Sequence, residues 1–344
     1  MSTLAKPFIR PSASLIIAAP ILFTNGIKND GSNYKILMMK RNAKSSFVNA
    51  HVYPGGVVDE ADNYLNWCEK DMNEKEGDLL TNKICAIRET FEESGLLLSN
   101  PPAHTIKDLN INIWRDKVHK DAAQFKVMCK TYNIRPATNQ LVPFSNWITP
   151  IIEKKRYDAH FFLTVLEGYK TKKEQDLHFN FVTADGEETV LFEWLKPEEG
   201  NFLPFFFYKN DKGSIKKYLA IEQQKEKKIV LIPPQWYSLS VLKEFLDYRD
   251  LKTKAGIDIF RTRHTNEIIT ILPQSHRVEP NSLEAKNGFN FYLAYPGDES
   301  YESKRYTKKK GNRHRLYFKG RMEEYFIERN VNMSNVVIQS TSNL

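Results

Sequence analysis

The sequence predicts a mixed α/β or α+β fold. Three observations support this prediction: strand-like apolar segments recur along the chain, helical segments lie between them, and no internal repeat is present. The chain has 344 residues, of which 41% are hydrophobic and 27% are charged. This length and composition are typical of one elaborated domain or two compact ones with a sizeable hydrophobic core.

Five segments carry the β-branched, aromatic and aliphatic residues that are typical of buried strands. In chain order they are residues 14–23, 34–39, 156–166, 189–194 and 229–232. A polar, glycine-containing stretch over 25–33 separates the first two, which predicts a turn that joins them into a hairpin.

Two segments show the clearest helical pattern, residues 81–94 and 238–249. The first is followed by Gly95, whose backbone can adopt the left-handed conformation that ends many helices. The apolar run after Gly95 then stops at Pro101-Pro102.

Beyond about residue 251 the pattern becomes strand-like again, with alternating apolar residues over 268–272 and 289–295. We therefore expect a main domain over 10–250, a β-rich extension over 251–334 packed on the same domain, and a flexible tail over 335–344.

Composition excludes several classes of protein. The longest apolar run, residues 15–23, has nine residues and contains Pro20, whereas a membrane-spanning helix needs about twenty apolar residues. The three cysteines share no CxxC spacing, which argues against a disulfide framework or a thiolate zinc site. These observations predict a soluble intracellular protein.

The positive charge is concentrated near the C-terminus. The formal net charge is +8, yet nine basic residues and no acidic one lie between Lys304 and Arg321, so the rest of the chain is close to neutral. This basic segment is either a solvated loop that leads into a strand or a patch that faces phosphate groups. Its interleaved aromatic residues would also suit RNA.

The helix expected over 81–94 carries three carboxylates. Its apolar residues recur at helical spacing on one face, namely Ile84, Ile87 and Phe91. Glu89, Glu92 and Glu93 have the spacing i, i+3 and i+4, which places their side chains within reach of one point. The repulsion between these charges favours a divalent cation such as Mg²⁺ or Mn²⁺, because such ions take oxygen ligands and bridge carboxylates to substrate phosphates. The alternative is a solvated acidic face.

The residues around this helix favour the cation. Arg88 lies one turn before Glu92 and can hold its carboxylate by an ion pair. Upstream, Tyr53-Pro54-Gly55-Gly56 predicts a tight turn at which backbone can approach a phosphate or a metal-bound water. A second acidic cluster follows the turn and could face the first, namely Asp59, Glu60 and Asp62.

In this order, Gly56, Asp62 and the run from Arg88 to Leu96 resemble the Nudix box, G-x5-E-x7-R-E-U-x-E-E-x-G-U, of Nudix hydrolases. The second half of the box matches at every charged position. There are three departures: Asp62 replaces Glu, Thr90 replaces an apolar residue, and 25 residues rather than seven separate Asp62 from Arg88. The resemblance implies a Nudix fold, a mixed β-sheet between helices, with an insertion in the box over about 63–80.

The resemblance also implies roles for the box residues. Glu92 and Glu93 would bind Mg²⁺ or Mn²⁺, and Glu89 would bind the metal or help to activate the attacking water. Arg88 would orient the glutamates, and Gly56 would offer its backbone carbonyl to the metal. Phosphoanhydride hydrolysis needs a neutralised phosphate and a polarised water, which such a cluster can supply with its metal.

The interrupted box resembles the peroxisomal coenzyme A diphosphatase branch of this family. Similar runs downstream include Trp147-Ile148-Thr149-Pro150 and Arg156-Tyr157-Asp158. The branch implies hydrolysis of coenzyme A or acyl-coenzyme A to 3′,5′-ADP and (acyl-)4′-phosphopantetheine. The alternatives are another nucleoside diphosphate-linked substrate, such as a dinucleotide, a nucleotide sugar or an RNA cap, or a non-catalytic protein that binds nucleotide or RNA. The three glutamates argue against this last alternative.

Four residues are candidate substrate contacts. Arg41 matches part of the coenzyme A signature upstream of the box, and Lys308 and Arg313 of the basic segment could seat the 3′-phosphate. Tyr53 could stack on adenine, or it could pack in the core.

The two ends of the sequence suggest different compartments. Lys6 and Arg10 lie among Ser and Thr, as in a mitochondrial presequence, although Pro7 would interrupt its helix. Ser342-Asn343-Leu344 resembles the peroxisomal address S-K-L. The sequence thus suggests the peroxisome, with an import receptor as a partner, and otherwise the cytoplasm or the mitochondrion.

Overall fold

The computed structural model describes most of the chain. The described residues are 8–22, 31–42, 50–68, 72–168, 171–179, 182–184, 189–197, 205–209, 215–219, 230–253, 260–319 and 324–336. Most of the expected turn at 25–33, Arg321 and the suggested address at 342–344 lie outside this part of the chain.

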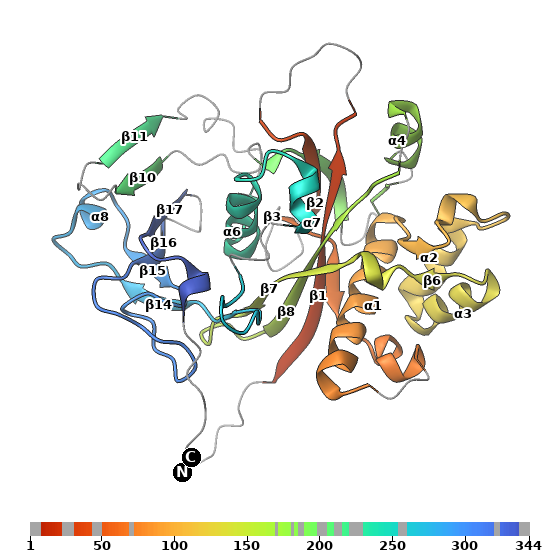
Figure 1. Ribbon diagram of the computed structural model, residues 1–344, viewed down its shortest axis with the longest axis horizontal. Helices are drawn as coiled ribbons and strands as arrows, with labels where there is room; N and C mark the ends of the chain where they lie inside the picture. Colours follow the sequence, from red (N-terminus) through yellow and green to blue (C-terminus); the bar gives the residue numbers. More distant parts are fainter. Residues whose placement is uncertain are drawn as a thin grey trace.

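A mixed sheet forms the centre of the molecule (Figure 1). Its strands are β1 (Ile9–Pro20), β2 (Tyr34–Arg41), β3 (Ala50–Val52), β4 (Gly55–Val57), β7 (Val142–Ile148), β8 (Arg156–Val165), β9 (Thr189–Leu195), β12 (Val230–Leu231) and β13 (Thr270–Ile271). The order is β12-β3-β2-β1-β8-β7-β13, with β4 also paired to β1 and β9 to β2. β1 runs parallel to β8 and antiparallel to β2, as expected for a hairpin.

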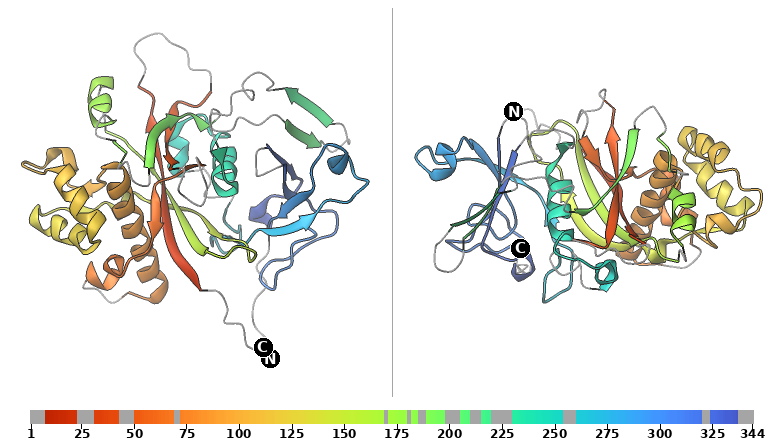
Figure 2. Two further views of the ribbon diagram at one scale, coloured as in Figure 1. Left: turned by 180° about the vertical axis from the view of Figure 1, so that it is seen from behind. Right: turned by 90° about the horizontal axis from the view of Figure 1, so that it is seen from above.

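Helices cover both faces of this sheet. On one side lie α1 (Glu74–Ser94), α2 (Ile111–Lys120) and α3 (Ala123–Thr131), and on the other lies α6 (Pro233–Leu242) (Figure 2). Further helices within the described ranges are α4 (Lys172–Phe179), α7 (Tyr248–Thr253) and α8 (Leu283–Lys286). Short 3₁₀ turns occur at η1 (Glu60–Asp62), η2 (Tyr64–Asn66), η3 (Ala103–Thr105), η4 (Thr138–Gln140) and η5 (Met333–Asn335). None of the helices in the described ranges is both long enough and apolar enough to cross a bilayer.

A second, antiparallel sheet lies beyond α6, in the order β14-β15-β16-β17. Its strands are β14 (Gln274–Arg277), β15 (Phe291–Ala294), β16 (His314–Lys319) and β17 (Glu324–Arg329). Two further strand pairs lie outside both sheets, β5 (Ser99–Asn100) with β6 (Arg135–Pro136) and β10 (Phe205–Lys209) with β11 (Ile215–Leu219).

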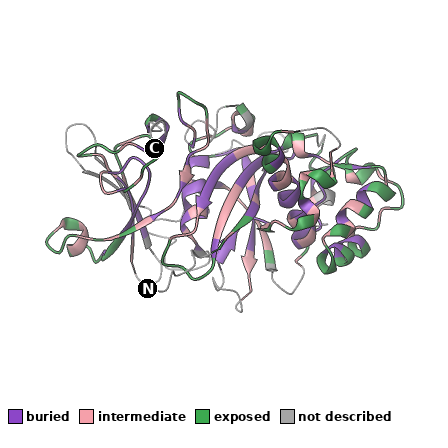
Figure 3. Ribbon diagram, turned by 90° about the horizontal axis from the view of Figure 1, so that it is seen from below, coloured by how far each residue is buried: buried purple, intermediate pink, exposed green. Residues whose placement is uncertain are grey.

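Two buried layers hold these elements together. One lies between the main sheet and α1 to α3, where side chains such as Leu15, Ile17 and Phe91 pack. The other lies on the opposite face of the sheet and continues through Trp236 of α6 to Leu316 of the second sheet. Figure 3 shows buried residues along the central strands and exposed residues on the outer helices. One continuous core therefore joins the second sheet to the main one.

The predicted helix at 81–94 begins earlier in the structure, at Glu74. The side chain of Asn73 accepts a hydrogen bond from the backbone N–H of Glu76 and so caps the helix. Gly77, which would weaken a helical pattern, lies against the ring of Tyr64, and a Cβ there would come within 2.5–2.8 Å of ring atoms. The helix ends as predicted, with Gly95 at a φ of 76°.

The single helix predicted over 238–249 is wrong, because two helices, α6 and α7, occupy this region. Pro233 and Pro234 start α6 early, since proline lacks only an N–H that the first turn leaves unused. Asp247 then starts α7, because its side chain accepts a hydrogen bond from the backbone N–H of Arg249 at 2.9 Å.

Candidate active site

The glycine turn lies directly against the box helix. In β4, Gly55 and Gly56 pair with Ser14 and Ala13 of β1. The backbone N–H of Gly55 donates to Glu93 Oε2 of α1 at 2.8 Å. Gly55 has a φ of 153°, and a Cβ there would come within 2.3 Å of the Ala13 carbonyl oxygen, so only glycine fits.

Gly56 is packed against Glu89. A Cβ at Gly56 would lie 2.4–2.6 Å from the three carboxyl atoms of Glu89. Its carbonyl oxygen lies 3.8 Å from Cys85 Sγ on the same helix. The glycine turn therefore packs against Glu89 and Glu93 of the box helix. That the Gly56 carbonyl binds a metal stays a prediction.

We expect Gly56→Ala to reduce activity much more than stability. The added methyl group would push the Glu89 carboxylate aside, and the end of a glutamate side chain moves easily. Turnover is expected to fall by about 10²-fold, because a small displacement of a reacting group strongly slows the reaction. The melting temperature is expected to change little. An unaltered turnover number in steady-state kinetics would contradict this role for the close packing.

Arg88 lies at the centre of the acidic residues. It is 3% exposed, and its Nε and Nη2 each donate to the Asp62 carboxylate at 2.8 Å. Its Nη1 donates to Glu92 Oε2 at 2.6 Å, which is the ion pair expected from the one-turn spacing. Glu89 Oε1 lies 3.0 Å from Nη2. Arg88 therefore holds three carboxylates together.

Asp62 retains a structural role although it is shorter than Glu. Its side chain accepts from the backbone N–H of Asp59, and the Asp59 side chain caps the η1 turn in return. This turn leaves Asp62 1% exposed and directed at Arg88. Of the three residues in the second acidic cluster, Asp62 alone is buried, while Asp59 caps η1.

The insertion continues into the box helix. After η1, the η2 turn packs Tyr64 on Gly77, and Trp67 Nε1 donates to the Ala61 carbonyl oxygen at 2.9 Å. From Glu74 on, the residues of 63–80 form the first turns of α1. A long separation in sequence thus still lets Asp62 and Arg88 meet in space.

Burial changes the protonation of the glutamates. Burial raises the pKa of Glu89 to about 7, against the opposing effect of Arg88, and it also raises the pKa of Glu92. A carboxylate whose ionisation is opposed by burial gains from a nearby cation. Without another cation, Arg88 is the charge that compensates these groups.

The described residues contain no group of three or more His, Cys, Asp or Glu side chains arranged to hold a metal ion. The glutamates share one side of α1, but Glu92 turns to Arg88 and Glu93 turns to Gly55. The expectation that all three reach one point is therefore not met in this arrangement. The donors themselves, three carboxylates and a backbone carbonyl, are the hard oxygen ligands that suit a divalent cation.

Sequence reasoning missed two residues of α2 at this site. His119 Nδ1 lies 3.5 Å from Glu92 Oε1, on the opposite carboxylate oxygen from Arg88. Arg115 Nε donates to the Glu92 carbonyl oxygen at 2.6 Å. The helix itself could have been found, because Asn110 is a capping residue and Trp114 and Val118 have helical spacing.

Two candidate substrate residues lie at strand ends, Arg41 as the last residue of β2 and Tyr53 directly after β3. Arg41 ends β2 at a register shift, and its Nε is buried without a hydrogen-bond partner among the described groups. Tyr53 is 2% exposed, its ring meets Phe161 edge-on, and it belongs to the core. Tyr53 therefore packs in the core, and the alternative of stacking on adenine is not supported.

The basic segment does not join the box helix. Lys308 pairs with Glu302, and Arg313 pairs with Glu299, within loops of the second sheet. That sheet and α1 lie on opposite sides of the main sheet (Figure 1). The prediction that Lys308 and Arg313 contact the substrate phosphate is not supported by this placement, because both cations already have carboxylate partners far from α1.

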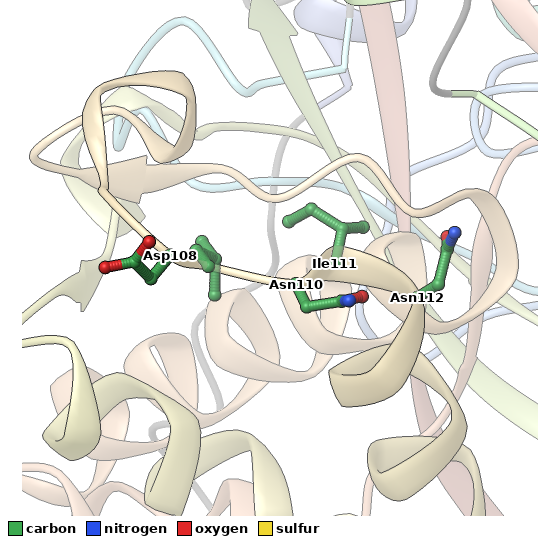
Figure 4. A pocket seen from close by; sticks show the side chains of 5 residues that line it. Asp108, Asn110, Ile111 and Asn112 are labelled. Atoms are coloured by element: carbon green, nitrogen blue, oxygen red, sulfur yellow. The ribbon is translucent and has the colours of Figure 1, made fainter.

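A cavity of about 400 Å³ opens at the start of α2 (Figure 4). Its lining residues are Asp108, Leu109, Asn110, Ile111 and Asn112. Asn110 is engaged as the helix cap, because its side chain accepts from the Ile113 N–H. No box residue lines this cavity, so it is separate from the candidate active site.

Comparison with known proteins identifies the family. The family model described as the NUDT19 Nudix domain matches residues 9–79 and 69–205, more than half of the chain. The chain belongs to this Nudix family. The Nudix segment matched thus extends from β1 through the box to β10.

Curated relatives and a solved structure agree with this Nudix assignment. An acyl-coenzyme A diphosphatase NUDT19 from Xenopus laevis is 28% identical over 71% of this chain and 67% of the relative. A protein of the same name from Gallus gallus is 28% identical over 81% of this chain and 76% of the relative. A Nudix hydrolase from Alicyclobacillus acidocaldarius aligns with a TM-score of 0.50 and 17% identity, over 73% of this chain and 98% of that one. The structural match shows the Nudix fold.

Proposed function

We propose that this Nudix protein hydrolyses the diphosphate linkage of coenzyme A or acyl-coenzyme A, using Mg²⁺ or Mn²⁺. Water would add across one P–O bond of the anhydride, giving 3′,5′-ADP and (acyl-)4′-phosphopantetheine. The observation that carries the proposal is the contact between the Gly55-Gly56 turn and the box glutamates. The names of the two relatives support the choice of coenzyme A as the substrate class.

The box residues have separate proposed roles. Glu89, Glu92, Glu93 and the Gly56 carbonyl would hold the divalent cation. That cation would neutralise the diphosphate and polarise water. Where Glu89 does not itself bind the cation, it is suited to accept the proton of the attacking water, because burial raises the pKa of its carboxyl in the metal-free protein to about 7. Arg88, bound by Asp62, would keep Glu92 oriented.

Arg41 is the candidate contact for the substrate phosphates. Its guanidinium lies at the end of β2, where the register against β9 shifts, and its buried Nε has no described partner. A guanidinium with an unused N–H suits a phosphate oxygen. We expect Arg41→Met to raise KM for coenzyme A more than it lowers kcat.

Product analysis tests the proposed function. The purified full chain is incubated with coenzyme A and Mg²⁺, and the products are identified by mass spectrometry beside a chelator control and a Glu93→Gln variant. We expect 3′,5′-ADP and 4′-phosphopantetheine only with the unaltered protein and metal. Turnover of a dinucleotide, a nucleotide sugar or an RNA cap instead would overturn the substrate. Metal-independent RNA binding without turnover of any substrate would overturn the reaction.

The affinity for metal should depend on pH. Below about pH 7 the metal-free protein keeps a proton on Glu89, and a cation must displace it. The affinity for Mn²⁺ is therefore expected to fall by roughly tenfold per pH unit below 7 and to level off above about 8. Titration calorimetry at pH 6, 7 and 8 measures this dependence, and equal affinities at all three values would refute it.

We propose the peroxisome as the compartment, from residues 342–344. A fluorescent protein fused ahead of residue 1, with the last three residues free, is expected to give punctate fluorescence that coincides with a peroxisomal marker. The same fusion with Leu344 removed is expected to be diffuse. Diffuse or mitochondrial fluorescence of the first fusion would contradict the proposal.

A further inference from the structure

Arg115 of α2 binds the backbone of the box helix. It is 8% exposed, and α2 lies beside α1 (Figure 1). Its Nε donates to the Glu92 carbonyl oxygen at 2.6 Å, and its Nη2 donates to the Glu93 carbonyl oxygen. Its Nη1 donates to Thr183 Oγ1 at 3.0 Å. One guanidinium therefore contacts both residues that supply the last two carboxylates of the box.

These carbonyl groups belong to the helix end. The last four carbonyl groups of an α-helix have no partner within the helix. In α1 the Phe91 carbonyl accepts from the Gly95 N–H at 2.8 Å, and the Ser94 carbonyl accepts from the Thr183 N–H at 3.2 Å. Arg115 supplies donors to the two carbonyls between them, so Gly95, Arg115 and Thr183 together satisfy the four carbonyls of the final turn.

The charge of Arg115 also suits this place. The C-terminal end of a helix carries a partial negative charge, and here three glutamates add to it. A planar guanidinium offsets this charge and fixes two backbone positions at the same time. The Glu92 carboxylate binds Arg88, and the Glu93 carboxylate accepts from the Gly55 N–H.

Arg115 is itself held firmly in α2. Trp114, next to it, meets the ring of Tyr132 edge-on, and Val118, one turn later, is 1% exposed. Asn110 caps the start of the helix. The position of the Arg115 guanidinium is thus set by a packed helix rather than by a loop.

We propose that Arg115 is a positioning residue, which sets the backbone of Glu92 and Glu93 so that their carboxylates can share a divalent cation. This inference rests on the proposed metal-dependent function. Arg115 donates to the backbone carbonyls of Glu92 and Glu93, so its proposed effect on the cation passes through these two residues.

Direct metal binding by the full chain tests the proposal. The variants are Arg115→Met, Thr183→Val, which removes the acceptor for Nη1, and Lys120→Met, which removes an exposed cation from the same helix. The Kd for Mn²⁺ is measured by titration calorimetry at pH 8, with melting temperatures and kinetics alongside. We expect the Kd to rise about 10–100-fold in Arg115→Met and several-fold in Thr183→Val, and to stay unchanged in Lys120→Met. We also expect kcat at subsaturating Mn²⁺ to fall, with KM for coenzyme A within about threefold of the original value.

A folded Arg115→Met variant with the original Kd for Mn²⁺ would overturn the proposal, since Arg115 would then serve stability alone. If Arg115→Met does not fold, Arg115→Lys replaces it, because lysine keeps the charge but lacks the planar fork. The same rise in Kd is expected for Arg115→Lys, and the original Kd would again overturn the proposal. Mn²⁺ binding without any coenzyme A hydrolysis would refute the proposed function while leaving this test valid.

Discussion

Glu89→Gln is expected to abolish most activity and to stabilise the metal-free protein. The variant keeps the size of the side chain but removes the base, so kcat is expected to fall by about 10²–10⁴-fold. Stability should rise because burial opposes ionisation of Glu89, whose pKa in the fold is about 7. The ionised Glu89 would thus lower the stability of the fold while it serves catalysis.

The sign of the stability change follows from the pKa shift. The raised pKa means that the folded protein holds a proton more tightly than the unfolded chain does, so the ionised carboxylate destabilises the fold. This destabilisation is fully present above about pH 7 and is absent below the ordinary pKa of about 4.5. We therefore expect Glu89→Gln to raise the free energy of unfolding by roughly 2–3 kcal/mol at pH 8 and by little at pH 4.

Thermal unfolding with a chelator, at both pH values, measures this change. Glu74→Gln is the matched control, because Glu74 lies on the same helix but is exposed. It should leave activity intact and shift the melting temperature only slightly. A Glu89→Gln variant that melts at a lower temperature at pH 8, or that keeps full turnover, would contradict the assigned role.

The largest loss of stability is expected from Asp298→Asn. Asp298 is 0% exposed, and its carboxylate accepts from Arg315 Nε and from the His314 backbone N–H, each at 2.8 Å. It also accepts from the Ser300 N–H at 2.7 Å, while Arg315 lies over the ring of Tyr292. Asparagine would turn an N–H₂ group toward some of these donors and remove the charge that Arg315 pairs with inside the protein, leaving Arg315 its longer contacts with Glu299 and Ser300. We expect a loss of about 3–5 kcal/mol.

Urea unfolding gives this loss, with Glu302→Gln as its control. Glu302 pairs with Lys308 in the same sheet region, but the pair is largely exposed. Exposed pairs contribute little, so the control is expected to change the urea midpoint only marginally. Equal effects of the two substitutions on the urea midpoint would show that the buried Asp298 pair contributes no more to stability than the exposed Glu302 pair.

The sequence predicts the box helix well where local signals agree. Ile84, Ile87 and Phe91 mark its buried face, and Gly95 marks its end. Its start is hidden, because Gly77 disfavours a helix locally and is explained only by the Tyr64 ring that packs on it. A local pattern cannot reveal a tertiary contact of this kind.

The same limit applies to the site. The charged residues of the box motif identify Arg88 and the box glutamates. In the structure Arg88 contacts both Glu92 and Asp62. The sequence leaves the basic segment open between a solvated loop and a phosphate-facing patch, because it does not reveal the partners of these residues. In the fold, Lys308 and Arg313 pair with Glu302 and Glu299, which lie shortly before them in the chain.

The parallel pairing of β1 with β8 has a consequence for synthesis of the protein. Ile9 lies opposite Arg156, so the first strand cannot complete its pairing until the chain has grown past β8. At about 5–20 residues per second, that delay lasts roughly 7–30 s on the ribosome. During this time the apolar run of β1 has an open edge, which invites association with other nascent chains. The yield of folded protein should therefore respond to chaperones that bind the chain during its synthesis.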